Sequence, residues 1–145
     1  MIALFCLNRA GRIDPANKWG KAYVWLTVIT CLTGLPIMKT GHFTPGHYDA
    51  ILVLLLLPLG VFAKNIFGKA ANYLQVIIMS TTLFLSLIPA VVETLTRLPL
   101  SHPLAADAGD PIAGKALSGL FLLFIVGVVY QIVKMRKSNQ PVAAK

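Results

Sequence analysis

Few side chains in this 145-residue chain could do chemistry, because only three histidines and five acidic residues stand in a sequence that is 57% hydrophobic. His42, His47 and His102 fall between the long apolar stretches or at their ends, and Glu93 lies near the end of one stretch. Imidazole nitrogens and a carboxylate oxygen could bind zinc or copper. The spacing of His42 and His47 matches no metal-binding motif, so we favour interfacial polar residues, with a metal site at these four residues as the alternative.

A second group of polar residues recurs within one apolar stretch. Gln75, Thr82, Ser86 and Glu93 fall on one face of a helix, since each residue advances by about 100°. Polar side chains of membrane helices point toward other helices, where hydrogen bonds fix the packing, and this is the favoured interpretation. The alternative is a small polar cavity that opens outward. Arg97 follows Glu93 by four residues, a spacing typical of an ion pair on a helix.

The sequence lacks the patterns of most enzymes and cofactor proteins. It contains no nucleophile elbow, phosphate-binding loop or HExxH motif. No histidine lies in the middle of an apolar stretch, which argues against a haem held by two histidines within a membrane. No charged residue lies there either, which argues against a proton relay. We therefore expect no catalytic residues and no cofactor, apart from the metal alternative at the histidines.

Four apolar stretches must position these residues. They cover about residues 22–38, 45–63, 73–95 and 115–133, and each is long enough, or nearly so, to cross a hydrocarbon core of about 30 Å. A backbone exposed to lipid must satisfy its own hydrogen bonds, and these stretches lack the alternation of barrel strands. We predict an all-α polytopic membrane protein, a single domain of four transmembrane helices with a basic tail at 134–145.

Composition supports lipid as the environment. Only 12% of residues are charged and the mean hydropathy is +0.75, whereas soluble domains carry about 25% charged residues. The net charge of +8 arises from basic residues in short segments between apolar stretches, so we expect no nucleic-acid partner. Cys6 and Cys31 are predicted at different depths, which disfavours a disulfide, and both are interpreted as small apolar fillers.

The lysines and arginines predict an orientation, because they accumulate on the cytoplasmic side of membrane proteins. Four membrane crossings place both ends of the chain and the link between the second and third helices on one side. That side holds ten basic residues: Arg9, Arg12, Lys18, Lys21, Lys64, Lys69, Lys134, Arg136, Lys137 and Lys145. The other side holds three basic residues, Lys39, Arg97 and Lys115, and four of the five acids, Asp49, Glu93, Asp107 and Asp110. We predict a bacterial inner-membrane protein with both termini in the cytoplasm.

Three segments in the first half of the chain form recognisable motifs: Gly20-Lys21-Ala22-Tyr23-Val24 at the start of the first helix, Phe43-Thr44-Pro45-Gly46-His47 at the start of the second helix, and Leu57-Pro58-Leu59-Gly60 within it. In these segments the chain resembles a family of predicted bacterial multi-pass membrane proteins of unknown function, which has a Gly-Arg-x-Tyr-Val motif in place of the first segment. The family usually has a histidine in the basic segment, where this chain has Asp14 and Asn17. It also usually has an upstream helix, of which Met1–Leu7 resembles a remnant. The resemblance implies a membrane fold and no activity.

These observations leave three functions open. The leading hypothesis is a non-enzymatic accessory or scaffolding subunit that acts by helix packing, either with copies of itself or within a larger membrane complex. The second is a component of a transporter for a small solute or a metal, built around the polar face of the third helix. The third is a redox or cofactor-binding membrane subunit. Small size, packing-type polar residues and the missing catalytic motifs favour the first.

Overall fold

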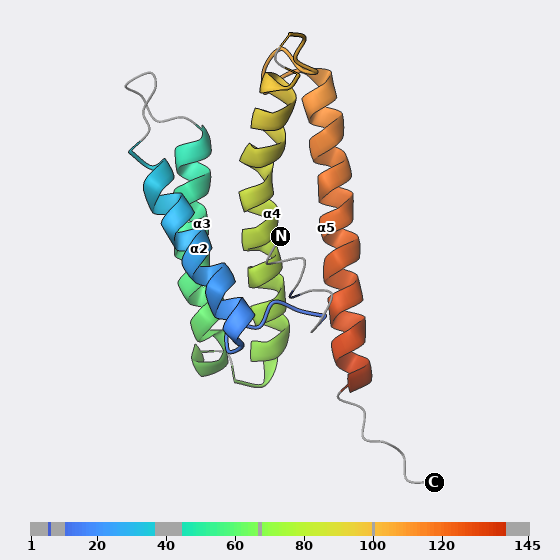
Figure 1. Cartoon of the computed structure of the whole chain (residues 1–145). Helices are drawn as coiled ribbons and strands as arrows, with labels where there is room; N and C mark the ends of the chain where they lie inside the picture. The colour runs from blue at the N-terminus through green and yellow to red at the C-terminus, as the bar shows by residue number, and fades with distance from the viewer. Residues whose placement is uncertain (1–5, 7–10, 37–44, 67, 100, 139–145) are drawn as a thin grey trace.

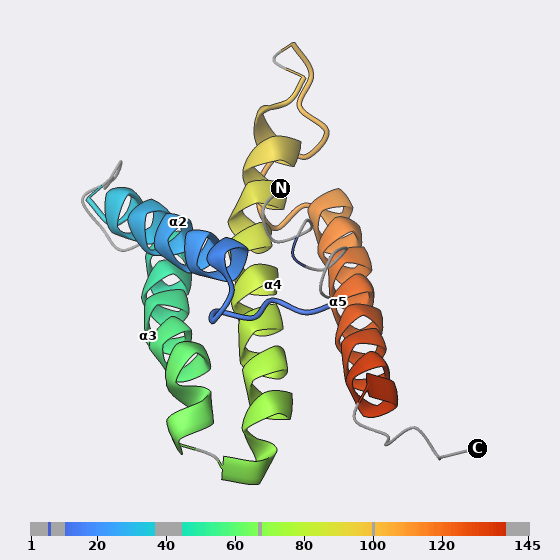
Figure 2. The ribbon, with the colours of Figure 1, turned by 60° about the horizontal axis from the view of Figure 1, so that its bottom comes forward.

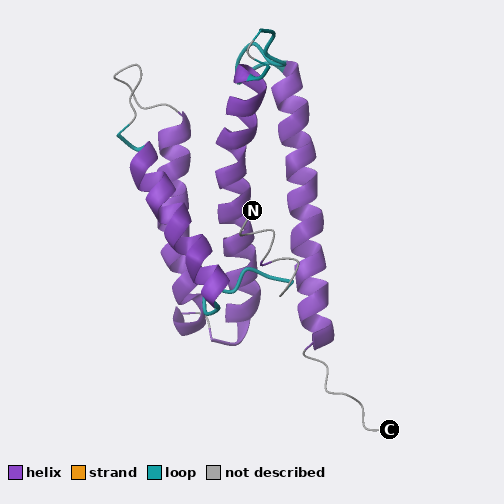
Figure 3. Ribbon diagram, viewed as in Figure 1, coloured by secondary structure: helices purple, strands orange, loops and turns teal. Residues whose placement is uncertain are grey.

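The computed structural model of this chain describes residues 6, 11–36, 45–66, 68–99 and 101–138, and every regular element in them is helical (Figure 3). The four α-helices are α2 (Lys18–Gly34), α3 (Pro45–Ile66), α4 (Ala71–Arg97) and α5 (Pro111–Ser138). A short 3₁₀ turn, η1 (Gly68–Ala70), leads into α4. The predicted all-helical architecture is confirmed, and so is the number of long helices in this part of the chain.

Helix α4 is the centre of the arrangement. It packs against α3 on one side and α5 on the other, while α2 lies against α3 (Figure 1). Helix α2 lies in front of α3 in Figure 1, and Figure 2 shows that the chain before α2 runs across α4 toward α5. The start of α2, the end of α3, the start of α4 and the end of α5 therefore share one end of the protein (Figure 1).

Three of the helices are long and apolar enough to cross a membrane. These segments are Gly46–Ile66, Ala71–Arg97 and Pro111–Arg136. Helix α2 has 17 residues, so it rises about 25 Å, slightly less than a hydrocarbon core of about 30 Å. The structure thus indicates a membrane protein with three spanning segments among the described residues, and α2 stands at the lower limit of length.

The bounds of the first and last helices differ from the predicted ones. The first begins at Lys18 rather than near residue 22 and ends at Gly34, and residues 37 and 38 of the predicted span lie outside the described residues. The last begins at Pro111 rather than near residue 115 and continues to Ser138, through the start of the segment predicted as a tail. Basic side chains do not end a helix, because lysine and arginine are good helix formers.

The early start of α5 has a local cause at Asp110. Its Oδ1 accepts a hydrogen bond from the backbone N–H of Ile112 at 2.8 Å, which is the geometry of an N-cap. Pro111 follows at the first helical position, where its missing N–H costs nothing. The Oδ2 atom accepts a second bond from the N–H of Ala106 at 3.0 Å, which ties the preceding loop to the helix start. These two bonds lower the pKa of Asp110, the bond from Ala106 more than that from Ile112.

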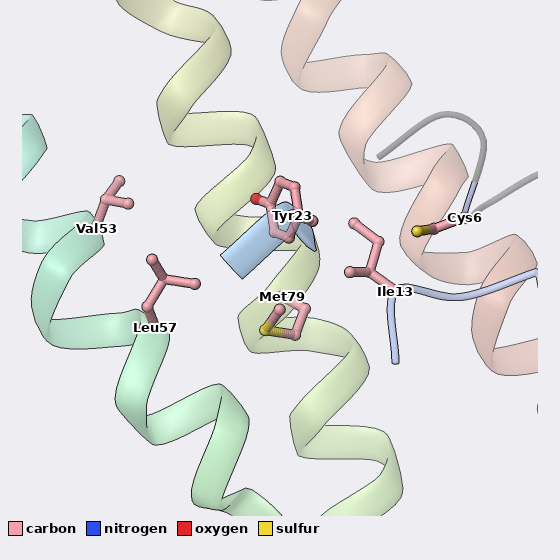
Figure 4. Packing of buried hydrophobic residues seen from close by; sticks show 6 residues of the cluster. All are labelled: Cys6, Ile13, Tyr23, Val53, Leu57 and Met79. Atoms are coloured by element: carbon pink, nitrogen blue, oxygen red, sulfur yellow. The ribbon is translucent and has the colours of Figure 1, made fainter. Parts of the chain in front are cut away.

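The core lies where α2, α3 and α4 meet the chain that precedes α2. Tyr23 and Met79 lie between two α3 residues on one side and two residues of the N-terminal region on the other (Figure 4). The flanking residues are Val53, Leu57, Ile13 and Cys6. Helices α3 and α4 approach closely at Gly60, where an added Cβ would lie 2.7 Å from Met79 Sδ.

Candidate functional site

Two buried amides connect α4 to its two neighbours. Gln75 Nε2 on α4 donates a hydrogen bond to the backbone carbonyl of Gly60 on α3, at 3.1 Å. Gln131 Nε2 on α5 donates to Ser80 Oγ on α4, at 2.9 Å. Gln75, Ser80 and Gln131 are all buried. Because a polar group left unpaired in an apolar interior is costly, each bond favours one register between its two helices.

A third hydrogen bond connects α4 to α2. The hydroxyl groups of Tyr23 and Thr82 lie 3.3 Å apart, and both residues are buried. Thr82 already donates its proton to the carbonyl of Met79 at 2.8 Å, so Tyr23 is the donor in this pair. Helix α4 thus contributes one buried polar side chain to the contact with each of the other three helices.

The predicted polar face of α4 is divided in the structure. Gln75 and Thr82 make the contacts with α3 and α2, whereas Ser86, half-buried, donates to the carbonyl of Thr82 within its own helix at 2.8 Å. Glu93 is exposed near the end of α4 and forms an ion pair with Arg97. The hydrogen bonds of Gln75, Thr82 and Ser86 thus lie within α4 or join it to α3 and α2, and Glu93 takes part in none of them.

The four candidate metal ligands lie in different parts of the chain. His42 lies outside the described residues. His47 is buried at the start of α3, His102 is exposed in the loop between α4 and α5, and Glu93 is paired with Arg97. Within the described residues, no three histidine, cysteine, aspartate or glutamate side chains gather closely enough to hold a metal ion.

A charged cluster that the sequence did not predict lies just before α2 and beside the end of α3. Asp14 is buried and forms ion pairs with Arg12 at 3.1 Å and with Lys64, at the end of α3, at 3.7 Å. Its Oδ1 atom also accepts a hydrogen bond from the N–H of Ala16 at 3.0 Å, which closes a turn just before α2. Asp14 therefore holds the N-terminal segment, residues 11–17, against α3.

Two glycines allow this segment to lie close to its neighbours. Gly20 on α2 faces the backbone carbonyl of Asp14 so closely that an added Cβ would lie 1.9 Å from that oxygen. Gly11 has a φ of +69°, which other residues rarely adopt, and the side chain of Lys134 on α5 covers it. The N-terminal segment thus contacts α2, α3 and α5 at the end where their basic residues lie.

The residues that were missed share one property. Ser80, Gln131, Asp14 and Lys64 each act through a partner far away in the sequence. A single amide near the end of the apolar run of α5 was a signal for an interhelical bond at Gln131, because such a group needs a partner in lipid. An aspartate surrounded by basic residues gave no comparable signal, since a solvated Asp14 would have the same sequence.

Burial raises the pKa of the Cys6 thiol, which is the expected result for a sulfur in an apolar environment. Because the thiolate is the reactive form, Cys6 is a poor nucleophile here. Both cysteines that the structure describes, Cys6 and Cys31, are free thiols. Neither contributes to a chemical site among the described residues.

Comparison with protein-family models, with curated proteins and with solved structures finds no match to this chain.

Proposed function

We propose that this chain is a bacterial inner-membrane protein in which all four helices cross the bilayer, with both termini in the cytoplasm, and that it serves as a non-enzymatic accessory or scaffolding subunit. The observation that carries this proposal is the use of the buried polar side chains of α4. Each of its hydrogen bonds to another helix fixes a contact between helices. Polar groups that could have bound a substrate are thereby engaged in packing.

The outer surface of α5 favours a partner in the membrane. Only 6% of its most apolar segment is buried within the protein, compared with 28% for α4. Leu122, Leu123 and Val126 are 65%, 70% and 65% exposed, so this surface is covered by lipid or by another protein. A subunit that acts by helix packing would use such a surface, since α4 is the helix against which α5 mainly packs.

The short helix α2 is compatible with a membrane crossing. Lys18 and Lys21 are exposed at its first turn, where their ammonium groups can reach the headgroups while their stems lie along the apolar surface. The exposed ring of Trp19 at the same end is of a type that favours the headgroup level. A helix slightly shorter than the hydrocarbon core is accommodated by such flanking residues and by local thinning of the bilayer.

Blue-native electrophoresis tests whether the protein belongs to a larger assembly. The protein is expressed at its native level, and its membranes are solubilised in a mild detergent. We expect a band larger than the monomer, and we expect Val126→Trp on α5 to reduce it because the larger ring disturbs packing on that surface. Leu55→Trp on α3 is the matched control, since Leu55 is 64% exposed but lies on another helix. A monomer as the only species, or equal loss in both variants, would contradict the proposal.

A further inference from the structure

Positive charge exceeds negative charge at the end of the protein where α2 begins and where α3 and α5 end. Six of its basic residues have described side chains, and we call them the basic collar: Arg12, Lys18, Lys21, Lys64, Lys134 and Arg136. All are exposed except Arg12, which is half-buried. Asp14 is the one acid at this end, because the other four acids of the chain are in α3, at the end of α4 and in the loop before α5.

The N-terminal segment makes the collar continuous. Asp14 draws Arg12 and Lys64 together, Gly11 lies against the side chain of Lys134, and Gly20 brings the start of α2 against Asp14. Basic residues from α2, α3 and α5 are thereby held around one end of the protein. Asp14 compensates one charge of the six, so the collar keeps an excess of positive charge.

Aromatic rings mark the depth of the collar. Trp19 lies between Lys18 and Lys21 and is 49% exposed, and Tyr130, 59% exposed, has the ammonium group of Lys134 at 5.7 Å from its ring centre. Exposed rings of this type favour the boundary between hydrocarbon and headgroups. The collar therefore lies at the level of lipid phosphates, where anionic lipids attract basic residues.

We infer that the basic collar binds the headgroups of anionic phospholipids, in preference to neutral ones, at the cytoplasmic surface. The inference rests on the membrane placement in the proposed function, but it does not need the chain to have a protein partner. Charge complementarity and the interfacial rings select phospholipid as the occupant. A soluble phosphate would gain nothing from the apolar surface directly beside these residues.

The two tryptophans of the chain, Trp19 and Trp25, both lie on α2 and supply a direct reporter. The full-length Trp25→Phe variant, which keeps Trp19 alone, is reconstituted in phosphatidylcholine vesicles that contain a fraction of phosphatidylglycerol brominated in its acyl chains. Bromine quenches indole fluorescence on contact. We expect stronger quenching than from the same fraction of brominated phosphatidylcholine.

Two variants separate the collar from net charge. In that background, Lys21→Gln is expected to weaken the preference for phosphatidylglycerol about fivefold, the contribution of one basic residue near an anionic surface. Lys115→Gln removes the same charge at the start of α5, at the opposite end, and is expected to leave the preference unchanged. An unchanged emission maximum in neutral vesicles verifies that each variant is folded.

The Trp25→Phe protein without a second substitution gives a test that does not depend on further variants. Raising the salt concentration to 1 M shortens the screening length to about 3 Å and is expected to remove most of the preference. Equal quenching by the two brominated lipids, or equal effects of Lys21→Gln and Lys115→Gln, would overturn the inference. So would displacement of the brominated phosphatidylglycerol by millimolar inorganic phosphate. A monomer on blue-native gels would leave it intact while refuting the subunit proposal.

Discussion

Replacing Gly20 by alanine tests whether the N-terminal segment is docked on α2. An alanine Cβ at this position would lie 1.9 Å from the carbonyl oxygen of Asp14. The same oxygen accepts the N–H of Asn17 at 3.0 Å, and the carboxylate of Asp14 is tied to Lys64. The obstacle is therefore backbone held from two directions, which cannot rotate away as a flexible side chain could.

The magnitude follows from two opposing effects. Overpacking of a close contact costs typically about 1–3 kcal/mol, and the rigid backbone places Gly20→Ala toward the upper end of that range. Alanine gains about 1 kcal/mol over glycine within a helix. The net loss is about 2 kcal/mol, which lowers the Tm by about 4–8 °C for a chain of this size.

Gly119→Ala is the matched control, because Gly119 lies within α5 and nothing would lie within 4 Å of its added Cβ. It keeps the helix gain without the clash and is expected to raise the Tm by about 2–4 °C. Thermal unfolding of both proteins in the same detergent, followed by size-exclusion chromatography of heated samples, measures the difference. A Tm for Gly20→Ala equal to that of Gly119→Ala would refute the docking of the segment.

Three further outcomes are expected. Asp14→Asn removes the ion pairs of Asp14 with Arg12 and Lys64 and should lower the free energy of unfolding by about 1 kcal/mol, measured as a Tm shift. Tyr23→Phe removes the bond to Thr82 and should cost about 0.6 kcal/mol, the average for hydrogen bonds between membrane helices. The lowered pKa of Asp110 means that its cap stabilises the loop before α5 above a pH of about 4, the ordinary pKa. That stabilisation is lost as the pH falls through the folded pKa, and amide hydrogen exchange in the loop measures it.

Each expectation has a result that would contradict it. An unchanged Tm for Asp14→Asn would mean that the described ion pairs contribute nothing to stability. A Tyr23→Phe protein that is more stable than the parent would mean that the bond to Thr82 is not formed. For Asp110, the control is Asp110→Asn, which cannot titrate; acid-dependent exchange that persists in this variant would place the pH dependence elsewhere in the loop.

The helices were predictable because lipid imposes a simple rule on the sequence. Long apolar runs gave the existence and order of α3, α4 and α5, and Pro45 marked the start of α3. The start of α5 was readable in principle, since Asp110 followed by Pro111 is a capping residue before a first-turn proline. The predicted helix began instead near Lys115, at the start of the apolar run.

The sequence predicted that polar residues of α4 would contact other helices, but it did not predict which helices. The spacing of Gln75 and Thr82 indicated one face of a helix, but which helices would meet that face depends on packing that periodicity does not contain. Ile13 is 1% exposed and Asp14 is 8% exposed, although both lie in a basic segment whose sequence is typical of a solvent-exposed terminus. Their burial follows from the close approach at Gly20, a contact between backbones that leaves no pattern in the sequence.

The orientation of the helices can be tested by thiol labelling of bacterial spheroplasts with a membrane-impermeant maleimide. Cys6 and Cys31 are first replaced by alanine, and a single cysteine is then placed at Asn17 or at Ala108, both exposed. With four crossings and cytoplasmic ends, Ala108→Cys reacts in intact spheroplasts and Asn17→Cys reacts only after the membrane is permeabilised. Labelling of Asn17→Cys from outside would mean that α2 does not cross as proposed or that the protein has the opposite orientation.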